Sequence, residues 1–544
     1  MEKKKRLQVW LPVIIAISII LGIFIGSSYN SFTIQKEMIS LLQNNKIQNV
    51  LSLISMQYVD SVDMEDLTEK TIPKILDELD PHSVYIPAKD AQAMNDDVLG
   101  SFSGIGVSFN MQTDTILVIS VIHGGPAEKA GLLPFDRIMT INDSIFSGKK
   151  RAQEDVMKNL KGPNGSQVSL GILRGDNKEL INFDVTRGKI PVNSVDVSYY
   201  VKDAIGYIKI SKFTRTTHDE LITAIAKLKA EKTCEGFIID LRSNGGGVLD
   251  VAINMINEFM PEERLLVYTE GEHMPRSEAY SNGTGLCKED PLVLLTDEFS
   301  ASASEIFAGA VQDNDRGLII GRRTFGKGLV QSPITLADGS EIRLTIARYH
   351  TASGRCIQKA YEKGKGAEYD EDIYKRFLHG EFDTADSIKA NTKETFKTRM
   401  GRTVYGGGGV MPDIFIPRDT TGVTSYFSSV INSGVLYRFA LEHSEANRKT
   451  FEKFKTWEEL NTYLKNSNLL NTFTSFAATQ GIKKRPYYIR ISAKLMEKQL
   501  RAYIVRNFFD DEGFYPIFME DDVTLWRAVD ILKSGKWKPT LKEK

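Results

Sequence analysis

The chain has 544 residues, of which 42% are apolar, and this excludes a collagen-like, low-complexity or mostly disordered protein. Lys and Arg number 69 against 70 for Asp and Glu, so the net charge of −1 provides no global field that would attract nucleic acid. The 3 cysteines are too few for a disulfide framework, and their spacing matches no zinc motif. We therefore expect several globular domains, no metal, no cofactor and no nucleic-acid partner.

The N-terminus is locally unbalanced in charge. Four basic residues at positions 3–6 precede an uncharged, mainly apolar run over residues 9–26. This run is near the minimum length for a helix that crosses about 30 Å of hydrocarbon. The basic cluster predicts that residues 1–8 are cytoplasmic, that residues 9–26 form a single-pass anchor in the inner or plasma membrane, and that the remaining chain is extracytoplasmic, in the periplasm. A cleaved signal peptide is the alternative, although its apolar core is normally shorter.

The next two regions differ in their apolar periodicity. Residues 30–95 carry apolar residues at helical spacing and predict a small helical region. The sequence LDPHS at residues 79–83 interrupts it, because proline disfavours helix in the preceding residue. Residues 98–190 instead alternate short β-forming runs with Gly-Pro turns, and PAEKAG at residues 126–131 predicts a short helix closed by glycine. We expect a separate, strand-rich domain there.

Residues 195–418 alternate strands with helices and predict an α/β domain. The runs 236–241 and 291–295 are continuously apolar, which is typical of strands in a sheet covered on both faces. Each is followed by a run with helical spacing, as in a βαβ unit. Residues 420–544 are predicted to be mostly helical, with an apolar stripe that is typical of core packing.

A candidate nucleophile follows the second of these strands. The sequence FSASASE at residues 299–305 ends a predicted strand and opens a helix. Small residues at such a turn let one side chain stand exposed at the edge of the sheet, and the N–H groups at the helix start are available to an oxyanion. Helix capping by Ser300 or Ser302 is the alternative, and it is the favoured one when this segment is taken alone.

A serine nucleophile needs a base, and none of the 7 histidines lies in a recognisable triad motif. Lys327 lies between two glycines with apolar flanks, where burial would lower its pKa and let it accept the serine proton. An exposed surface lysine is the alternative. Residues 321–327 also match the GxxxxGK of phosphate-binding loops, but Gly328 replaces the required Ser or Thr, so we do not expect an ATPase.

The glycines at residues 245–247 end the 236–241 strand. Three successive glycines let backbone N–H groups approach a ligand oxygen closely, and a tight turn is an equally good explanation.

An ordered series of motifs extends over most of the chain. In chain order these are LDPHS at 79–83, SGIGV at 103–107, PAEKAG at 126–131, DRIMTIN at 136–142, GYIKI at 206–210, DLRSNGGG at 240–247, SASASE at 300–305, FGKG at 325–328 and VYGGGGVMPD at 404–413. Together they resemble the C-terminal processing peptidases, or tail-specific proteases, which are serine–lysine proteases with an inserted PDZ domain.

This resemblance implies a multi-domain α/β protein with a crotonase/Clp-like protease core. It implies Ser302 as nucleophile, Lys327 as general base and Gln331 as the residue that orients the lysine. On an ideal strand, positions i and i+4 are about 13 Å apart, so Gly328 would have to permit a bend. Asp313 is a lesser candidate with a structural role. The expected oxyanion donors are the N–H groups of Ala303 and of Gly246 or Gly247, and the residues expected to bind the substrate C-terminus are Gly104, Ile105, Gly106 and Val107.

The predicted function is that of a membrane-anchored, extracytoplasmic serine endopeptidase acting on proteins or peptides with a free C-terminus. A catalytically inactive PDZ scaffold of the cell envelope is the alternative, and the presence of both Ser302 and Lys327 favours the enzyme. The family usually has proline where this chain has Gly245. The sequence leaves open the substrate, and whether residues 30–95 and 420–544 mediate a homodimer, bind an adaptor or gate the site.

Overall fold

The structure is a computed structural model, and it describes residues 17, 20–22, 45–111, 115–175, 177–389 and 391–540. It divides into two compact units, residues 1–76 and 77–544. The predicted anchor at residues 9–26 lies almost entirely outside the described residues. Within the described part of the chain, no helix combines the length and the apolar character that crossing a bilayer requires.

The first unit contributes a pair of helices. They are α2 (Lys46–Gln57) and most of α3 (Met64–Asp77), which fall within the predicted helical region. Asn45 caps α2 by accepting a hydrogen bond from the N–H of Gln48. The carboxylate of Asp63 accepts from the first N–H groups of α3 in the same way.

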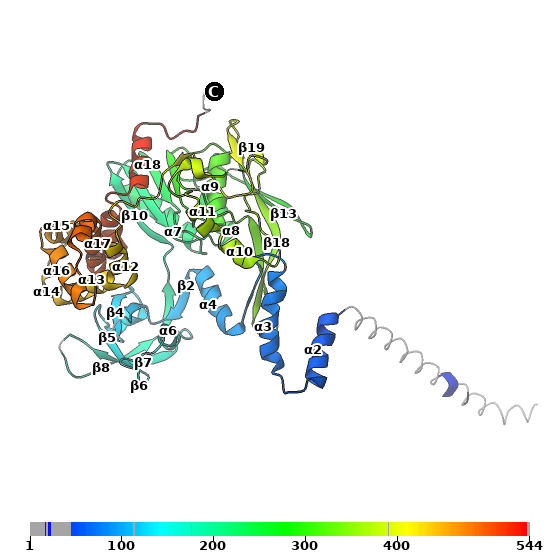
Figure 1. The fold of residues 1–544 in the computed structure, drawn as a ribbon, viewed down its shortest axis with the longest axis horizontal. Coiled ribbons are helices and arrows are strands. Elements are labelled where there is room, and N and C mark those ends of the chain that lie inside the picture. The colour runs from blue at the N-terminus through cyan, green and yellow to red at the C-terminus, as the bar shows by residue number, and fades with distance from the viewer. Residues whose placement is uncertain are drawn as a thin grey trace, which may run out of the picture. The chain divides into compact units, whose positions relative to one another are not determined.

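Residues 98–190 of the second unit contain a five-stranded antiparallel path in the order β3-β4-β5-β7-β8. Figure 1 shows β4, β5, β7 and β8 close to α6. Its elements are β3 (Val107–Asn110), β4 (Ile116–Val121), α5 (Pro126–Ala130), β5 (Arg137–Ile141), β6 (Ser144–Ile145), α6 (Gln153–Leu160), β7 (Gln167–Leu173) and β8 (Ile181–Thr186). Alternate strand residues such as Val118 and Leu170 are fully buried beneath α6 residue Val156. Gly131 ends α5 with φ +93°, the left-handed cap that the sequence predicts.

A six-stranded sheet forms the centre of the second unit, in the order β10-β11-β12-β15-β16-β21. The strands are β10 (Val195–Lys202), β11 (Ile205–Ile210), β12 (Gly236–Asp240), β15 (Leu292–Thr296), β16 (Leu318–Gly321) and β21 (Ile414–Phe415). All neighbouring pairs are parallel except β10 and β11. Every residue of β12 and β15 is buried, as expected for strands covered on both faces.

Helices cover both faces of this sheet because its side chains alternate. One face carries Ile239 and Leu294, which pack with α7 (Thr217–Glu231), α8 (Leu249–Asn257) and α9 (Ala303–Asp313). The other face carries Ile238 and Leu295, which pack with α18 (Val523–Lys533). The predicted helical region 420–544 is therefore not one packing unit, because its last helix belongs to the core of the central sheet.

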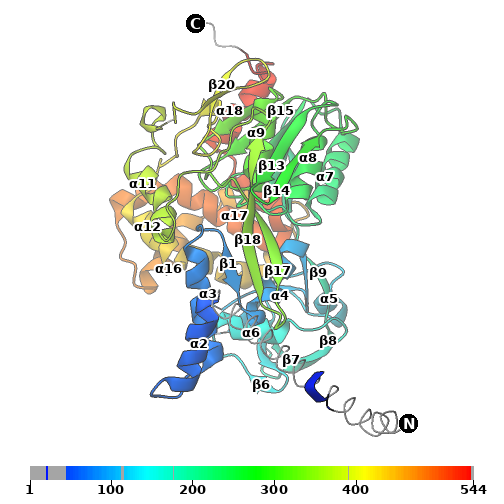
Figure 2. The ribbon, with the colours of Figure 1, turned by 90° about the vertical axis from the view of Figure 1, so that its right-hand side faces the viewer.

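A second sheet brings distant segments together beside the first. Its strands are β1 (Val84–Ile86), β13 (Leu265–Gly271), β14 (Met274–Tyr280), β17 (Leu329–Thr335) and β18 (Glu341–Thr351). Strand β18 pairs with β1, β13 and β17, and Figure 2 shows β17 and β18 as a long paired ribbon. The remaining short elements are α4 (Ala88–Leu99), β2 (Ser101–Gly104), β9 (Gly188–Pro191), α10 (Gly366–Asp370), α11 (Asp372–Leu378), η1 (Ala385–Ser387), β19 (Thr395–Lys397) and β20 (Thr403–Tyr405).

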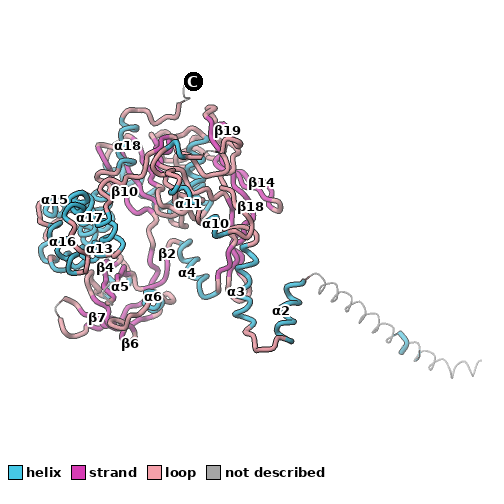
Figure 3. The backbone as a smooth tube through the Cα atoms, in the orientation of Figure 1, coloured by secondary structure: helices cyan, strands magenta, loops and turns pink. Residues whose placement is uncertain are grey.

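The other C-terminal helices lie together, as Figure 3 shows. They share a hydrophobic core of their own. They are α12 (Ser425–Asn432), α13 (Val435–Ala446), α14 (Arg448–Phe451), α15 (Trp457–Lys465), α16 (Leu469–Thr479) and α17 (Pro486–Phe518). This bundle contacts the strand-rich domain through an ion pair between Arg137 and Glu445, at 2.7 Å, and through the rings of Phe135 and Phe508.

Candidate active site

Ser302 lies in the turn from β15 into α9, where the sequence predicts an exposed serine. Its backbone has φ +55° and ψ −115°, a conformation that non-glycine residues rarely adopt and that is typical of a strained nucleophile turn. Ser302 is partly exposed, whereas Ala301 and Ala303 on either side are buried. It is also the N-cap residue of α9, so both interpretations of the sequence apply to the same position.

The two neighbouring serines have structural roles. The Ser300 hydroxyl donates to the Leu241 carbonyl oxygen at 2.8 Å, and the Ser304 hydroxyl donates to the Asn244 carbonyl oxygen at 2.9 Å. Both side chains are fully buried. They fasten the serine turn to the loop that follows strand β12.

The carboxylate of Glu305 joins the serine turn to the lysine loop. Its Oε2 accepts hydrogen bonds from the backbone N–H groups of Ser302, at 2.9 Å, and Lys327, at 2.8 Å. Its Oε1 accepts from the N–H of Gly326, at 2.7 Å, and from the hydroxyl of Thr324. Burial raises the pKa of Glu305 to about 7, against these hydrogen bonds, which favour the charged form. Ser302 and Lys327, which are 25 positions apart in the sequence, thus donate to the same buried carboxylate oxygen.

Tyr349 of β18 makes a second connection between the same two residues. Its buried hydroxyl lies 3.2 Å from the carbonyl oxygen of Ser302 and also bonds to the carbonyl oxygen of Lys327. The structure therefore brings the candidate nucleophile and the candidate base together through contacts to their N–H groups and to their carbonyl groups.

The Lys327 side chain reaches Gln331, with Nζ donating to Oε1 at 2.9 Å. Burial lowers the pKa of Lys327, and the positive charge of Arg343 adds to this, whereas the carboxylates of Glu305 and Asp80 oppose it. A lysine with a lowered pKa has the property that a general base at neutral pH requires.

The expected bend at Gly328 is not the explanation for this contact. Lys327 precedes β17, which begins at Leu329, so the pair does not lie on an ideal strand. The register with β18 also shifts between Val330 and Gln331. Gly328 is needed for a different reason: a Cβ there would lie 2.8 Å from the backbone nitrogen of Gln358.

The glycine loop lies directly against the serine turn. A Cβ on Gly246 would lie 2.7 Å from the Ser302 Cβ and 2.9 Å from the Ala303 nitrogen, and Gly246 has φ +99°. The Gly246 N–H donates to Asn244 Oδ1 at 2.9 Å. The Ala303 N–H is in the first turn of α9, where no intrahelical acceptor exists. At Gly245, by contrast, a Cβ would meet no atom within 4 Å.

Asp313 lies at the opposite end of α9 from Ser302, about 15 Å away for a helix of this length. It forms a fully buried ion pair with Arg355 at 2.8 Å and accepts hydrogen bonds from Thr351 and Ser353. This arrangement holds β18 and the following turn against α9.

The Gly104–Val107 loop connects β2 to β3 in the strand-rich domain. Its carbonyl groups are used internally, because Ile105 accepts from the N–H of Ala127 at 2.8 Å and Gly106 from that of Ile122 at 2.9 Å. Gly106 has φ +79°, which favours glycine. The following strand β3 lies at the edge of its sheet, so one side of its backbone can pair with an extended peptide.

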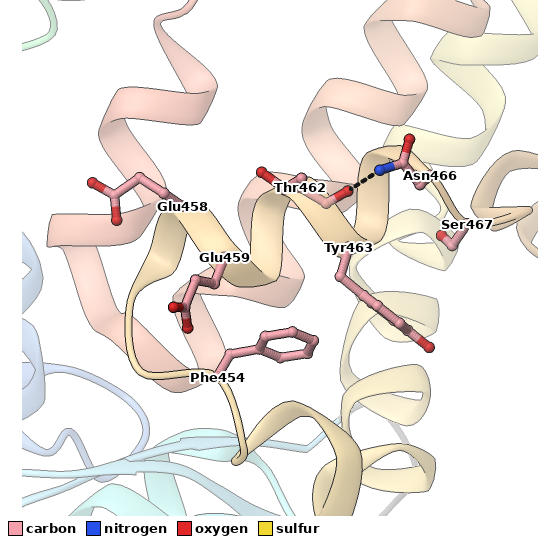
Figure 4. A pocket seen from close by; sticks show the side chains of 7 residues that line it. All are labelled: Phe454, Glu458, Glu459, Thr462, Tyr463, Asn466 and Ser467. Carbon is pink, nitrogen blue, oxygen red and sulfur yellow. Dashed lines mark hydrogen bonds between the residues drawn. The ribbon is translucent and has the colours of Figure 1, made fainter.

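A hollow of about 830 Å³ lies elsewhere, on α15 of the C-terminal bundle (Figure 4). Its lining includes Phe454, Tyr463 and the acidic Glu458 and Glu459, and none of the candidate site residues. Among the described residues, no group of three or more His, Cys, Asp or Glu side chains could hold a metal ion.

Four family models match parts of this chain. Peptidase family S41 matches residues 204–373, the PDZ domain residues 103–185, the activating protease CtpB N-terminal domain residues 27–90, and a family of unknown function residues 426–510. The carboxy-terminal-processing protease of Bartonella bacilliformis is 35% identical over 346 residues, which cover 62% of this chain and 78% of that protein. The carboxy-terminal processing protease CtpB of Bacillus subtilis is 36% identical over 318 residues, covering 58% and 65%.

Among solved structures, the photosystem II D1 C-terminal processing protease is 25% identical, covers 68% of this chain and 92% of its own, and has a TM-score of 0.34, which is too low to carry an inference. The family matches and the two relatives define a serine-type peptidase with a PDZ domain. This chain belongs to the C-terminal processing peptidase family, and the resemblance noted in its sequence is confirmed.

Proposed function

We propose that this protein is a serine endopeptidase in which Ser302 is the nucleophile, Lys327 the general base and Gln331 the residue that orients the lysine. The observation that carries the proposal is the bridge made by Glu305, whose Oε2 accepts from the N–H groups of both Ser302 and Lys327. The lowered pKa of Lys327 supports its role as a base, because the neutral amine is the form that takes a proton.

The chemistry is acyl transfer. Neutral Lys327 takes the proton of Ser302 as Oγ attacks a peptide carbonyl carbon. The oxyanion is held by the N–H of Ala303 and by that of Gly246 or Gly247. Gly246 would first exchange its hydrogen bond to Asn244 for one to the oxyanion. The lysinium then protonates the amide nitrogen as the C–N bond breaks, and water, deprotonated by Lys327, hydrolyses the acyl-enzyme.

Substrate selection is assigned to the PDZ domain. A glycine loop at residues 104–107 can present backbone N–H groups to a terminal carboxylate, and the edge strand β3 can pair with the residues before it. The proposed substrates are therefore proteins or peptides with a free, extended C-terminus.

We also propose that the chain is a single-pass protein of the inner or plasma membrane with its catalytic body in the periplasm. The support is the basic cluster at residues 3–6 followed by the uncharged run at residues 9–26. A test compares the full chain with one that lacks residues 1–26. The full chain should remain with membranes after alkaline extraction and the shortened chain should not. Release of the full chain by alkali would contradict the proposal.

The proposed activity is tested by intact-mass and N-terminal analysis of the products formed from denatured β-casein. The parent should produce fragments, whereas Ser302→Ala and Lys327→Ala should each retain less than about one-thousandth of the rate. Replacement of the exposed Lys363 by Ala is the matched control and should leave the rate unchanged.

A second substrate, an unstructured peptide made with either a free or an amidated C-terminus, tests recognition. The free form should be cleaved faster. If Ser302→Ala cleaves as well as the parent, the nucleophile is wrong. A parent that binds the free peptide but cleaves nothing would establish the scaffold alternative.

A further inference from the structure

A ring of hydrogen bonds, closed through the chain itself, includes the Lys327 side chain and residues with no assigned role. The first half of the ring begins with Lys327 Nζ, which donates to Gln331 Oε1 at 2.9 Å. Gln331 Nε2 in turn donates to the backbone carbonyl oxygen of His82. The amide that orients the lysine is therefore fixed at its far end by the LDPHS segment, 249 residues earlier in the chain.

The second half of the ring returns to the lysine loop. His82 Nε2 lies 2.9 Å from the Tyr369 hydroxyl, which also accepts from Gln358 Nε2 at 3.2 Å. Gln358 Oε1 accepts from the N–H of Gly328 at 2.7 Å, and Gly328 directly follows Lys327. Because the Tyr369 hydroxyl accepts from Gln358, its own proton is available to His82. Each hydrogen bond named here then has one donor and one acceptor, with His82 Nε2 as the acceptor from Tyr369.

The LDPHS segment itself is held firmly. Asp80 accepts hydrogen bonds from the N–H groups of His82, at 2.8 Å, and Ser83, at 2.9 Å, and from the hydroxyl of Thr345 on β18, at 3.0 Å. Strand β1, which begins two residues after His82, pairs with β18. The backbone carbonyl of His82 thus has a fixed position, and its side chain makes one more connection, to Tyr369.

The surroundings of His82 favour the neutral form of its imidazole. Burial lowers the pKa of His82 to about 4, and the charge of Lys327 contributes to this, as does that of Lys359, whereas Asp80 opposes it. The other charged groups near Lys327 are Glu305 and Arg343. Tyr369 is 5% exposed, and its ring packs edge-on against the ring of His82 at 5.1 Å. The Nε2 atom of a neutral imidazole can accept a hydrogen bond from the tyrosine hydroxyl.

We propose that His82 and Tyr369 are positioning residues for catalysis, and that their mutual hydrogen bond holds the carbonyl oxygen to which Gln331 is tied. This inference rests on the proposed function. It gives the LDPHS segment and residues 358–369 a role in holding the Lys327 side chain in position. Neither residue touches the substrate. Their effect is exerted through Gln331, which keeps the Lys327 amine in one place and in dry surroundings.

The variant Tyr369→Phe removes a single oxygen atom and leaves the ring in place. Loss of this hydrogen bond should lower kcat about tenfold and change KM less than about twofold, because the substrate does not contact Tyr369. The Lys327 side chain should become more hydrated, so its pKa should return toward the ordinary value. The rising limb of kcat against pH should therefore move to higher pH.

Two further variants make the result specific. His82→Ala should reproduce both effects, and combining it with Tyr369→Phe should add little, because both remove the same hydrogen bond. His82→Gln places an amide near the tyrosine hydroxyl and should recover part of the loss. Tyr361→Phe is the matched control, since its ring packs against that of Tyr369 but its hydroxyl is outside the ring of hydrogen bonds. It should leave kcat and its pH profile unchanged.

The inference is overturned if Tyr369→Phe melts like the parent and keeps the parent's kcat and pH profile. It is also overturned if the effects of His82→Ala and Tyr369→Phe simply add. Should Tyr369→Phe fail to fold, the comparison of His82→Gln with His82→Ala decides, since a purely structural role would leave the pH limb in place. Failure of the proposed function is separate and is visible in the parent and in Ser302→Ala alone.

Discussion

The candidate active site and the candidate peptide-binding loop of the PDZ domain both contain glycine-rich turns, but their backbone groups are used in opposite ways. In the candidate active site, the N–H groups of Ser302, Gly326 and Lys327 all donate to the buried carboxylate of Glu305. In the PDZ domain, the loop at residues 104–107 leads into β3, which has a sheet neighbour on one side only.

The difference reflects what each region has to do. Bond breaking needs a nucleophile and a base whose relative positions are already fixed, and the shared Glu305 carboxylate fixes the backbone of both. Recognition of an extended peptide needs backbone groups that are left for the peptide to pair with. Rigid support should therefore be essential in the first region, and an open edge in the second.

The largest effect is expected from Glu305→Gln, which disrupts the hydrogen bonds that connect the serine turn to the lysine loop. Each carboxylate oxygen of Glu305 accepts two hydrogen bonds. The substitution replaces one oxygen by an amide nitrogen, which cannot accept hydrogen bonds, so two of the four donors would lose their partner. We expect kcat/KM to fall at least about 100-fold and the free energy of unfolding to fall by about 2–3 kcal/mol. Peptide cleavage rates and urea denaturation measure the two effects. Activity within a few-fold of the parent would show that Glu305 does not link Ser302 to Lys327.

The next effect compares adjacent glycines. Gly246→Ala would place a Cβ 2.7 Å from that of Ser302, at a position with φ +99°, whereas Gly245→Ala meets no atom within 4 Å. We expect about a 100-fold loss of kcat for Gly246→Ala, because the serine turn must shift to make room. Gly245→Ala should remain within about twofold of the parent. Equal activities of the two variants would contradict the close packing of this loop on Ser302.

The pH dependence of the free energy of unfolding should distinguish the buried candidate active site from the solvent-exposed surface of the PDZ domain. The pKa of His82 is lowered to about 4 from 6.5, so the unfolded chain binds a proton that the folded chain does not between these values. Stability should therefore fall as the pH falls from 6.5 toward 4, by about 3 kcal/mol for this group. Glu305, whose pKa is raised from 4.5 to about 7, acts in the opposite direction. Its contribution to the stability of the folded chain is lost as the pH rises from 4.5 toward 7.

His82→Gln isolates the histidine: when the pH is lowered from 7 to 4.5, the urea midpoint of this variant should fall less, or rise more, than that of the parent. The control is His123→Gln in the PDZ domain, where the histidine side chain is 99% exposed. The urea midpoint of His123→Gln should change with pH as much as that of the parent does. An unaltered pH dependence in His82→Gln would mean that His82 is not buried in neutral form.

The smallest effect is expected in the PDZ loop. Gly106→Ala places a Cβ 2.9 Å from Ile190 Cδ1 at φ +79° and should displace the loop. KM for a peptide with a free C-terminus should rise about tenfold, with kcat within about twofold, because the chemistry takes place in another domain. Steady-state kinetics separates the two constants. A fall in kcat at constant KM would contradict the division of labour between the two regions.

The sequence was informative where function depends on local geometry. The small residues around Ser302 predict the strand-to-helix turn, and the glycines around Lys327 predict a loop rather than a phosphate site, since β17 follows. The spacing of an ideal strand does not apply to Lys327 and Gln331, because Lys327 precedes β17 and the register with β18 shifts between Val330 and Gln331.

Other parts of the site were not predictable from spacing. The SxxE pattern formed by Ser302 and Glu305 indicates a helix cap, but nothing local says that the same carboxylate also binds the lysine loop. Tyr349 and His82 reach the site through the pairing of β18 with β17 and β1. Such long-range pairing depends on the folded sheet and leaves no periodic signal in the sequence.

The most direct measurement of the central claim is covalent labelling of the protein with a fluorophosphonate, followed by intact-mass and peptide mass analysis. Ser302 should gain one phosphonyl group with loss of fluoride, and the labelling rate should rise with pH as Lys327 loses its proton. Ser302→Ala should not be labelled, and Lys327→Ala should be labelled at a small fraction of the parent's rate. Labelling of a different residue, or equal rates for the parent and Lys327→Ala, would contradict the account.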